Sequence, residues 1–343
     1  MKALVLKEYL KFEYTDVQLP EIKPDEVLVR IKAVAICGSD VHGFDGSSGR
    51  RIPPVIMGHE AAGIIEAVGP DVTTFSVGDR VTIDSTIYCR NCGPCSAGNV
   101  NLCDNRRVFG VSCDDYRKDG AMAEYAAVPE YILYRLPDSV SFEIASVIEP
   151  LAIAAHAINR TNIRLGDNVM VAGCGTIGML TVKLLNIMGC STIIAVDIDD
   201  AKLAMAIKNG AVYSINSKRE DVASRVAKLT RGEKADAVFE AVGISDTVGY
   251  SINSLKKGGE LTLVGNIQKK VDFPLQYVVT NEININASCA AAGEYAACIK
   301  LIGSGKIDLS DIVSVTAPLS EGAKWFEKLH KGLSGVIKVV LLP

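Results

Sequence analysis

Four cysteines lie close together in the segment YCRNCGPCSAGNVNLC. Their spacing is C-x2-C-x2-C-x7-C, and the residues are Cys89, Cys92, Cys95 and Cys103. Four thiolates can complete the tetrahedral shell of one Zn²⁺ and leave no position open for a substrate. Four unrelated thiols and an iron–sulfur site of similar composition are the alternatives. The spacing favours a structural zinc site, which stabilises a loop and does no chemistry.

A second set of metal-binding residue types precedes this lobe. Cys37 lies in AICGSDVHG, and His59 and Glu60 lie in MGHEAAG. A thiolate, an imidazole and a carboxylate can hold a catalytic Zn²⁺ whose remaining position is open to water or an alcohol. Taken singly, Cys37 is more often a small core residue and His59 a hydrogen-bonded structural histidine. The hypothesis of a catalytic zinc site therefore depends on the three residues together.

A glycine-rich turn, GCGTIG, directly follows the apolar run NVMVA and opens a helical pattern. Its glycines form GxGxxG, which allows a tight turn, a close approach of the backbone to a pyrophosphate, and close packing of helix on strand. The helix N-terminus adds N–H donors and a partial positive charge. A tight turn with incidental glycines is the alternative. The predicted cofactor-binding residues of this turn are Gly173, Gly175, Thr176, Ile177 and Gly178.

Asp197 ends the next apolar run, TIIAVD, and follows Gly173 by 24 residues. A carboxylate at this place can bind the ribose hydroxyls of an adenosine and repels a 2′-phosphate, so Asp197 favours NAD over NADP. Lys202 is the next cation along the chain. It either contacts the ribose or is an ordinary solvated lysine.

The elements that must position these residues change in type near residue 150. Before it, Val27 to Ala35 alternates as a half-buried strand does, and GIIEAVG and DRVTID add further short strands. This pattern predicts a β-rich, barrel-like domain.

After residue 150, short apolar strands alternate with helical patterns, which predicts a doubly wound parallel sheet. One such helix follows the glycine-rich turn and is expected to stop at Gly189. Beyond about residue 288 the pattern becomes mixed, with a predicted helix over Lys324–His330 and a final strand, VIKVVLLP. Pattern alone does not assign this tail to a domain.

The composition is that of an ordinary globular protein of 343 residues, with 48% hydrophobic residues and a net charge of −4. That charge argues against nucleic acid or an anionic membrane as a partner. Charges interrupt the N-terminal apolar stretch, and no uninterrupted apolar run approaches the length of a membrane span. We therefore expect a cytoplasmic protein whose ten cysteines are reduced. Four of them are expected to be small core residues: Cys174, Cys190, Cys289 and Cys298.

The chain resembles the medium-chain zinc-dependent alcohol dehydrogenases, and most of all their polyol branch of sorbitol and galactitol-phosphate dehydrogenases. The resemblance rests on AICGSDVH, GHEAAGIIEAVGPDV, the four-cysteine lobe, VIEPLAIAAHA and the GxGxxG unit, which occur here in the family's order. It implies a GroES-like catalytic domain over 1–150, completed by 289–343, and a Rossmann NAD-binding domain over 151–288. It also implies a homodimer or homotetramer.

The resemblance further implies which residues hold the catalytic zinc. Cys37, His59 and Glu60 match the ligand positions, and Glu149 matches a glutamate that binds the zinc directly or through a water. Asp40 matches a residue that orients the histidine ligand. With the four-cysteine site, two zinc ions per chain are expected.

The resemblance also suggests a proton path. Ser39 matches the hydroxyl that takes the substrate proton, and His42 fits the outer end of the relay. A helix cap and a plain surface histidine are the respective alternatives. In this hypothesis zinc lowers the pKa of the substrate hydroxyl, the proton leaves through Ser39, and hydride passes to the nicotinamide.

The substrate is expected to be a polyol or a polyol phosphate. The expected mouth of the site includes Phe44, Arg50, Arg51 and Phe109, where the paired arginines either meet a phosphate or form a solvated loop pair. The segment Cys113–Lys118 is interpreted as an added loop near the site.

One residue departs from the sorbitol dehydrogenases. They usually place an arginine before the glutamate of the segment that here reads TNEINI, whereas this chain has Asn281. A threonine-type amino-alcohol dehydrogenase is the alternative among enzymes. A noncatalytic NAD-binding protein is the alternative of another class, but it predicts a disrupted set of zinc ligands.

Overall fold

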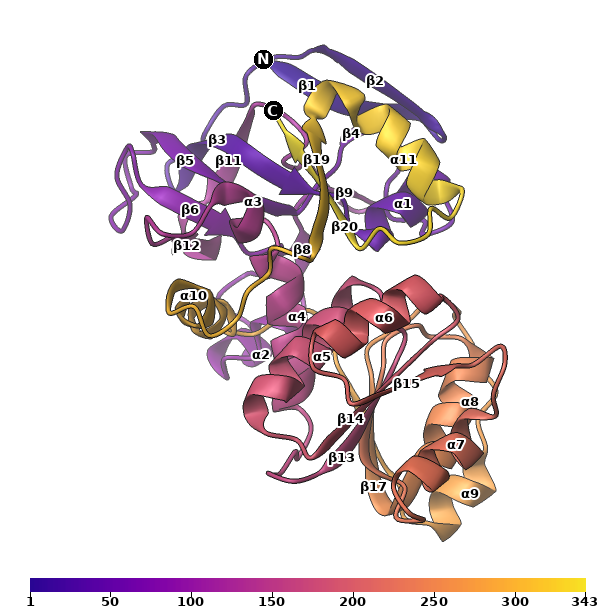
Figure 1. Ribbon diagram of the computed structural model, residues 1–343. Helices are drawn as coiled ribbons and strands as arrows, with labels where there is room; N and C mark the ends of the chain where they lie inside the picture. Colours follow the sequence, from indigo (N-terminus) through magenta and orange to yellow (C-terminus); the bar gives the residue numbers. More distant parts are fainter. The chain divides into compact units, whose positions relative to one another are not determined.

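The computed structural model describes all residues from Met1 to Pro343. The chain forms two compact units (Figure 1). Unit 1 comprises Met1–Glu149 and Tyr295–Pro343, and unit 2 comprises Pro150–Glu294. The C-terminal tail thus belongs to the same unit as the N-terminal half of the chain.

Unit 1 is built around a seven-stranded sheet in the order β12-β6-β5-β3-β20-β19, with β11 pairing to β3. The alternation that predicts a strand over Val27 to Ala35 corresponds to β3, whose inward side chains lie in the core. The strands are β3 (Glu26–Ala35), β5 (Glu60–Val68), β6 (Arg80–Ile83), β11 (Tyr125–Pro129), β12 (Leu133–Arg135), β19 (Val313–Pro318) and β20 (Lys338–Leu342).

Smaller elements complete unit 1. A three-stranded sheet contains β1 (Lys2–Glu8), β2 (Lys11–Asp16) and β4 (Val55–Ile56). Two two-stranded sheets are β7 (Thr86–Ile87) with β8 (Arg107–Val108), and β9 (Val111–Ser112) with β10 (Arg117–Lys118). The helices are α1 (Gly38–Phe44), α2 (Gly93–Ser96), α3 (Phe142–Ala145), α10 (Tyr295–Gly303) and α11 (Gly322–His330), with 3-10 turns at Val100–Leu102, Glu130–Ile132 and Leu319–Glu321. The β-rich character predicted for this half is confirmed.

Two strand pairings of β3 matter for the chemistry of unit 1. The register places Ala35, at the end of β3, opposite Glu60 of β5 on one side and Val340 of β20 on the other. The residues that follow β3 and those at the start of β5 and β20 therefore lie close together, at one end of these three strands. Cys37, His59, Glu60 and Lys338 all lie at these ends.

Unit 2 contains a six-stranded parallel sheet in the order β15-β14-β13-β16-β17-β18. In chain order this is 3-2-1-4-5-6, the arrangement of dinucleotide-binding doubly wound folds. The predicted parallel sheet is confirmed. The strands are β13 (Asn168–Ala172), β14 (Thr192–Asp197), β15 (Tyr213–Asn216), β16 (Ala235–Glu240), β17 (Leu255–Leu263) and β18 (Asn284–Ala287).

Helices cover both faces of this sheet, with α5 and α6 on one side and α7, α8 and α9 on the other (Figure 1). Gly189, with φ of +82°, ends α5 at the predicted place. The Asp199 side chain caps α6 by accepting from the Ala201 N–H at 2.9 Å. The helices are α4 (Ile148–Asn159), which leads into the unit, α5 (Thr176–Met188), α6 (Asp200–Lys208), α7 (Val222–Leu229), α8 (Ser245–Ser254) and α9 (Leu275–Thr280).

One stretch, Phe142–Asn159, has the length and composition of a membrane span, with a mean hydropathy of 1.2. It is 67% buried inside the protein, as the core helices of globular proteins also are.

The prediction that four further cysteines are core residues holds only in part. Cys174 and Cys298 are buried, and Cys190 is half-buried. Cys289 is exposed, so its assignment to the core is wrong. It lies two residues beyond the end of β18, the edge strand of the sheet, whose own residues are mostly exposed.

Candidate active site

Three predicted metal ligands converge in unit 1. One ligand atom each of Cys37, His59 and Glu60 lies within 4.8 Å of the others. His59 and Glu60 are buried, and Cys37 is half-buried. A soft thiolate, an imidazole and a carboxylate are a suitable donor set for Zn²⁺ with an open position. The residues present therefore fit a catalytic zinc ion.

Asp40 is placed to fix the histidine. Its Oδ1 lies 3.4 Å from His59 Nδ1 and accepts hydrogen bonds from Arg51 Nε at 3.2 Å and Nη2 at 2.9 Å. Burial alone would raise the pKa of Asp40, but the charges of His59 and Arg51 outweigh it and lower the pKa below its usual value. An ionised Asp40 beside Nδ1 favours the ring orientation in which Nε2 is left for a metal.

Arg51 corrects one expectation from the sequence. It is 4% exposed and pairs with Asp40, so it is neither a solvated loop residue nor free to meet a phosphate. Arg50, by contrast, is exposed. The predicted added loop is the β9–β10 hairpin, in which Arg117 pairs with Ser112, and Ser112 also forms a bridge with Arg51.

The other two residues expected at the mouth are also buried. Phe109 is fully buried. Phe44 is 3% exposed and stacks on Phe12, with ring centroids 5.3 Å apart, and also meets Phe326 of α11. Both aromatic residues belong to the core of unit 1 rather than to an exposed entrance.

Lys338 is a charged residue of the site that the sequence analysis missed. Its ammonium group is almost fully buried and donates to Glu60 Oε1 at 2.9 Å, to Glu60 Oε2 at 2.7 Å and to the Ile36 carbonyl at 3.2 Å. Burial alone would lower the pKa of Lys338, but the negative charges of Glu60 and Cys37 raise it. A lysine inside the apolar run VIKVVLLP was the available signal, because a buried cation needs an anionic partner.

Glu149 is buried near these groups but outside the set of three ligand atoms. Its Oε1 accepts a hydrogen bond from Ser85 Oγ at 2.8 Å. Burial raises the pKa of Glu149 to about 6, and the nearby Glu60 adds to the rise.

The two predicted proton-relay residues lie on the short helix α1. The Ser39 side chain is exposed, and its hydroxyl donates to Cys37 Sγ at 3.3 Å. His42 is exposed, with Nδ1 3.5 Å from Ser47 Oγ. Three residues apart on a helix, Ser39 and His42 lie on the same face. A helix cap was the alternative role for Ser39. In the structure it is Asp40 that contributes to the cap of α1, because its Oδ2 accepts a hydrogen bond from the Cys37 N–H at 3.4 Å.

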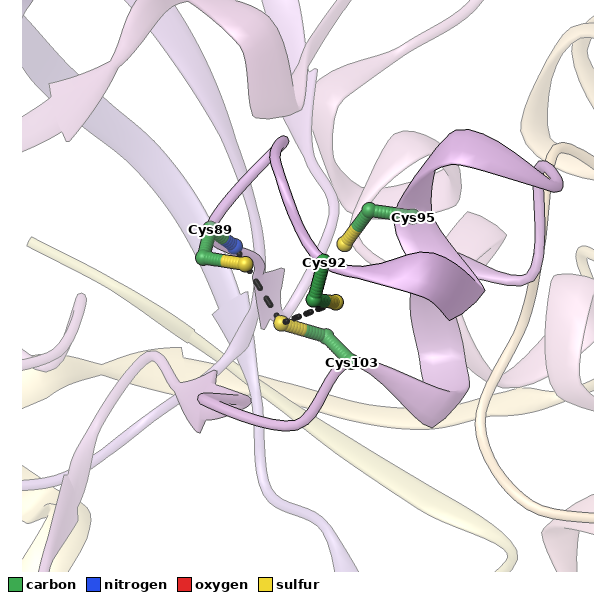
Figure 2. Close-up of side chains that lie close together, drawn as sticks. All are labelled: Cys89, Cys92, Cys95 and Cys103. Carbon is green, nitrogen blue, oxygen red and sulfur yellow. Dashed lines mark hydrogen bonds between the residues drawn. The ribbon is translucent and has the colours of Figure 1, made fainter.

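The four cysteines of the lobe also converge (Figure 2). Their sulfur atoms all lie within 4.8 Å of one another, and Cys92 Sγ is 3.9 Å from Cys103 Sγ. Sulfurs bound tetrahedrally to one zinc ion at about 2.3 Å are separated by about 3.8 Å. Backbone N–H groups of Cys89 and Asn105 donate to Cys103 Sγ at 3.2 and 3.3 Å, which stabilises a thiolate there. The lobe therefore fits a structural zinc ion.

The acid–base properties of this cluster agree with that fit. A hydrogen bond from the backbone N–H of Asn91 is the main cause that lowers the pKa of Cys89 to about 6. Desolvation and the hydrogen bond with Cys92 raise the pKa of Cys95 to about 12. Four thiols this close cannot all ionise unless a cation balances their charge.

The glycine-rich turn of unit 2 forms at the carboxyl end of β13. A Cβ on Gly178 would lie 1.7 Å from the Gly173 carbonyl oxygen, so packing of helix on strand requires this glycine. A Cβ on Gly175, which caps α5, would meet no atom within 4 Å. The protein's own packing thus gives no reason for a glycine at 175, whereas the close approach of a pyrophosphate does. The turn therefore fits a dinucleotide.

Asp197 lies against the same turn. Its carboxylate accepts hydrogen bonds from the backbone N–H groups of Cys174 at 2.7 Å, Ile198 at 2.8 Å and Asp199 at 3.0 Å. Lys202 is half-buried on the first turns of α6. Thr176 and Ile177 form the first turn of α5, where N–H groups point toward the strand ends. The predicted cofactor residues are thus grouped at the carboxyl edge of the sheet.

Comparison with known protein families agrees with both units. Residues 23–138 match the family described as "Alcohol dehydrogenase GroES-like domain", and residues 176–304 match "Zinc-binding dehydrogenase". Sorbitol dehydrogenase from Bacillus subtilis (strain 168) is 31% identical over 347 residues, which cover 100% of this chain and 97% of that protein.

Solved structures are similar over their whole length. Galactitol-1-phosphate dehydrogenase from Escherichia coli has a TM-score of 0.93 at 26% identity, with 100% of both chains covered. A zinc-binding dehydrogenase from Sinorhizobium meliloti 1021, bound to NADP, has a TM-score of 0.92 at 30% identity and covers 100% of this chain and 99% of that chain. The chain belongs to the medium-chain zinc-dependent alcohol dehydrogenases, in their polyol dehydrogenase branch.

Proposed function

We propose that this zinc- and nicotinamide-dependent oxidoreductase uses NAD to oxidise a secondary hydroxyl of a polyol or polyol phosphate, with Cys37, His59 and Glu60 holding a catalytic zinc ion. The supporting observation is the convergence of these three side chains within 4.8 Å in a chain of the polyol branch. When bound, zinc would supply a Lewis acid for the substrate hydroxyl, and the nicotinamide would supply the hydride acceptor.

The surrounding residues would hold the ligands in place. Asp40, itself held by Arg51, orients the His59 ring, and Lys338 fixes both oxygens of Glu60. Glu149 donates no atom to the tight set and accepts from Ser85 instead. This arrangement favours contact between Glu149 and the zinc through a water.

The substrate proton would leave along α1. The Ser39 hydroxyl, which its hydrogen bond to Cys37 Sγ holds close to the candidate zinc site, would take up this proton at its oxygen and release its own hydroxyl proton toward His42. His42 follows on the same helix face and is open to solvent. We propose that it passes the proton to water, a task that suits an imidazole near neutral pH.

NAD is proposed over NADP because of Asp197. Its carboxylate is fixed by three backbone N–H groups at the end of β14, where an adenosine ribose binds in this fold. A 2′-phosphate at that position would meet a negative charge. The NADP-bound relative makes this preference a point to measure.

The decisive experiment measures NADH or NADPH formation from a panel of polyols, polyol phosphates and threonine. We expect a polyol or polyol phosphate to react with NAD, and bound zinc near two ions per chain. Cys37→Ser should lose activity and keep about one zinc, held by the four-cysteine lobe. Preference for NADP, for threonine, or full activity and zinc content in Cys37→Ser would each contradict the proposal.

The alternatives have less support. A noncatalytic NAD-binding protein predicts a broken ligand set, whereas all three ligands converge here. No observed contact favours an amino alcohol. Asn281 departs from the arginine that sorbitol dehydrogenases usually carry, so the proposal does not name sorbitol as the substrate. In the structure the Asn281 side chain donates to the Tyr277 carbonyl at 2.8 Å, at the end of α9.

We also propose that the protein is a homo-oligomer that pairs through the β18 edge of unit 2. This strand is the last of the sheet, and apolar side chains are exposed on it and in the segment between β17 and β18: Ile267, Phe273, Leu275, Val279 and Ile285. An exposed strand edge with apolar neighbours favours a partner, and a second copy would continue the sheet. A cytoplasmic location is proposed as well, because the cysteines of the two candidate metal sites are placed to bind zinc and no cysteine forms a disulfide.

A further inference from the structure

Glu240 is a fully buried carboxylate at the carboxyl end of β16. Its Oε1 accepts three hydrogen bonds, from the Val242 N–H at 3.0 Å, the Gly243 N–H at 2.8 Å and Thr247 Oγ1 at 2.7 Å. Its Oε2 is buried without a protein partner. One carboxylate oxygen thus ties the strand end to the segment that leads into α8.

The segment held by Glu240 lies tightly between two glycines. A Cβ on Gly173 would lie 2.4 Å from Val242 Cγ2, and a Cβ on Gly265 would lie 2.2 Å from the Val242 carbonyl carbon. Val242 therefore packs directly against the first glycine of the dinucleotide turn. Any shift of this segment changes the shape of that turn's surroundings.

The contact between Val242 and Gly173 lies where a parallel sheet is expected to bind its ligand. β16 is next to β13, at the point where the strand order reverses. In open parallel sheets ligands bind in the crevice outside the carboxyl ends of the strands at this point. Glu240 and the glycine turn stand on the two strands that border it.

A buried carboxylate such as that of Glu240 is an unfavourable choice for a residue that only stabilises a turn. Burial of a carboxylate is unfavourable unless its hydrogen bonds compensate, and here only one of the two oxygens has partners in the protein. Charge-assisted hydrogen bonds are shorter and stronger than neutral ones, so they restrict the segment more firmly. Rigidity of a binding surface lowers the entropy lost on binding.

We propose that Glu240 is a positioning residue for the dinucleotide: it fixes Val242–Thr247 against the glycine turn and so shapes the cofactor site before the cofactor binds. The inference rests on the proposed function of that turn. Burial first, and then the negative charges of Glu240 and Asp197, raise the pKa of Tyr250, so both carboxylates act on the same side chain.

The test is Glu240→Gln, which keeps the size of the side chain and one acceptor oxygen but removes the charge. Affinity for NADH is measured by fluorescence titration of the intact protein without substrate. We expect Kd to rise about tenfold, as the three bonds become neutral and the segment loosens. KM for NAD should rise similarly, whereas kcat at saturating NAD should change little, because Glu240 holds no reacting atom.

Asp236→Asn is the matched control. Asp236 lies at the opposite end of the same strand and accepts the Asn168 N–H at 2.7 Å, so its loss weakens the sheet away from the proposed cofactor edge. We expect a lower unfolding temperature with an unchanged NADH Kd. If Glu240→Gln behaves like Asp236→Asn, with lower stability but unchanged Kd and KM, Glu240 is only structural and the inference is wrong.

Thr247→Val covers the case in which Glu240→Gln fails to fold. It removes one of the three bonds and keeps the carboxylate, so Kd should rise about two- to threefold; no change would overturn the inference. If the unaltered protein binds neither NADH nor NADPH, the proposed function itself fails. If it binds NADH and both variants bind it equally well, only the inference about Glu240 fails.

Discussion

Replacement of Lys338 by methionine tests how the candidate zinc site is held together. Lys338→Met keeps most of the apolar volume of the side chain and removes the charge that pairs with Glu60. Both partners are about 1% exposed, and both Glu60 oxygens lie within 2.9 Å of the ammonium nitrogen. Removal of one partner of such a pair leaves an uncompensated buried charge, which costs about 3–5 kcal/mol of unfolding free energy.

The matched control is Lys2→Met. The Lys2–Asp16 pair has the same 2.7 Å nitrogen–oxygen distance, but its side chains are 45% and 75% exposed. Solvent screens such a pair, so we expect little measurable change in unfolding free energy. Two variants with the same change of charge and the same original distance thus differ mainly in burial.

The assay is urea unfolding followed by circular dichroism, with and without prior chelation of zinc. Loss of stability in Lys338→Met should be larger after chelation, because a bound zinc ion would compensate part of the Glu60 charge. The double variant Lys338→Met/Glu60→Gln should recover most of the lost stability, since it leaves no buried charge at this position. If Lys338→Met costs no more than Lys2→Met, the assignment of a strong buried ion pair is refuted.

Three further predictions concern the other candidate sites. Gly175→Ala should fold normally, because its Cβ would meet no atom within 4 Å, yet should weaken NADH binding by about tenfold or more; Gly178→Ala should instead unfold at a lower temperature, since its Cβ would lie 1.7 Å from a carbonyl oxygen. Equal NADH affinity in Gly175→Ala would refute the pyrophosphate contact. Cys103→Ser should lose one of two zinc ions and the order of the four-cysteine lobe, measured by metal analysis and limited proteolysis, and a full zinc content would argue against a structural site. Val279→Lys, at an exposed position of α9, the helix before β18, should shift light-scattering mass from an oligomer toward the monomer, and an unchanged mass would place the interface elsewhere.

Features that depend on local geometry could be predicted from the sequence. The strand Asn168–Ala172, the glycine turn and the stop at Gly189 agree with the structure because each depends on a few adjacent residues. The same is true of the four cysteines, whose short spacing limits how far apart their sulfurs can lie. The convergence of Cys37 with His59 depends on the register of β3 and β5, which the sequence does not fix; residue types and the family resemblance supplied only the hypothesis that the two residues meet.

The charged partners of the site could not be predicted in this way. Lys338 and Glu60 are separated by 278 residues, and they meet only because β20 pairs beside the end of β3. Arg51 lies close to Asp40 in sequence, yet a loop arginine is usually solvated, and its burial depends on the packing of α1 against it. The prediction that Phe44 lies at the mouth of the site was wrong for a related reason: the sequence does not distinguish an aromatic residue near a site from one in the core.

The buried charges around the three candidate ligands also bear on the metal. Arg51 balances Asp40, and Lys338 balances one negative charge among Glu60, Glu149 and the thiolate that Cys37 would provide. With those groups ionised, two negative charges remain, and a low-dielectric interior does not tolerate them unpaired. One divalent cation held by Cys37, His59 and Glu60 would neutralise the site, whereas a monovalent ion would not. The two buried cations, neither of them a metal ligand, therefore leave a site whose remaining charge suits a dication.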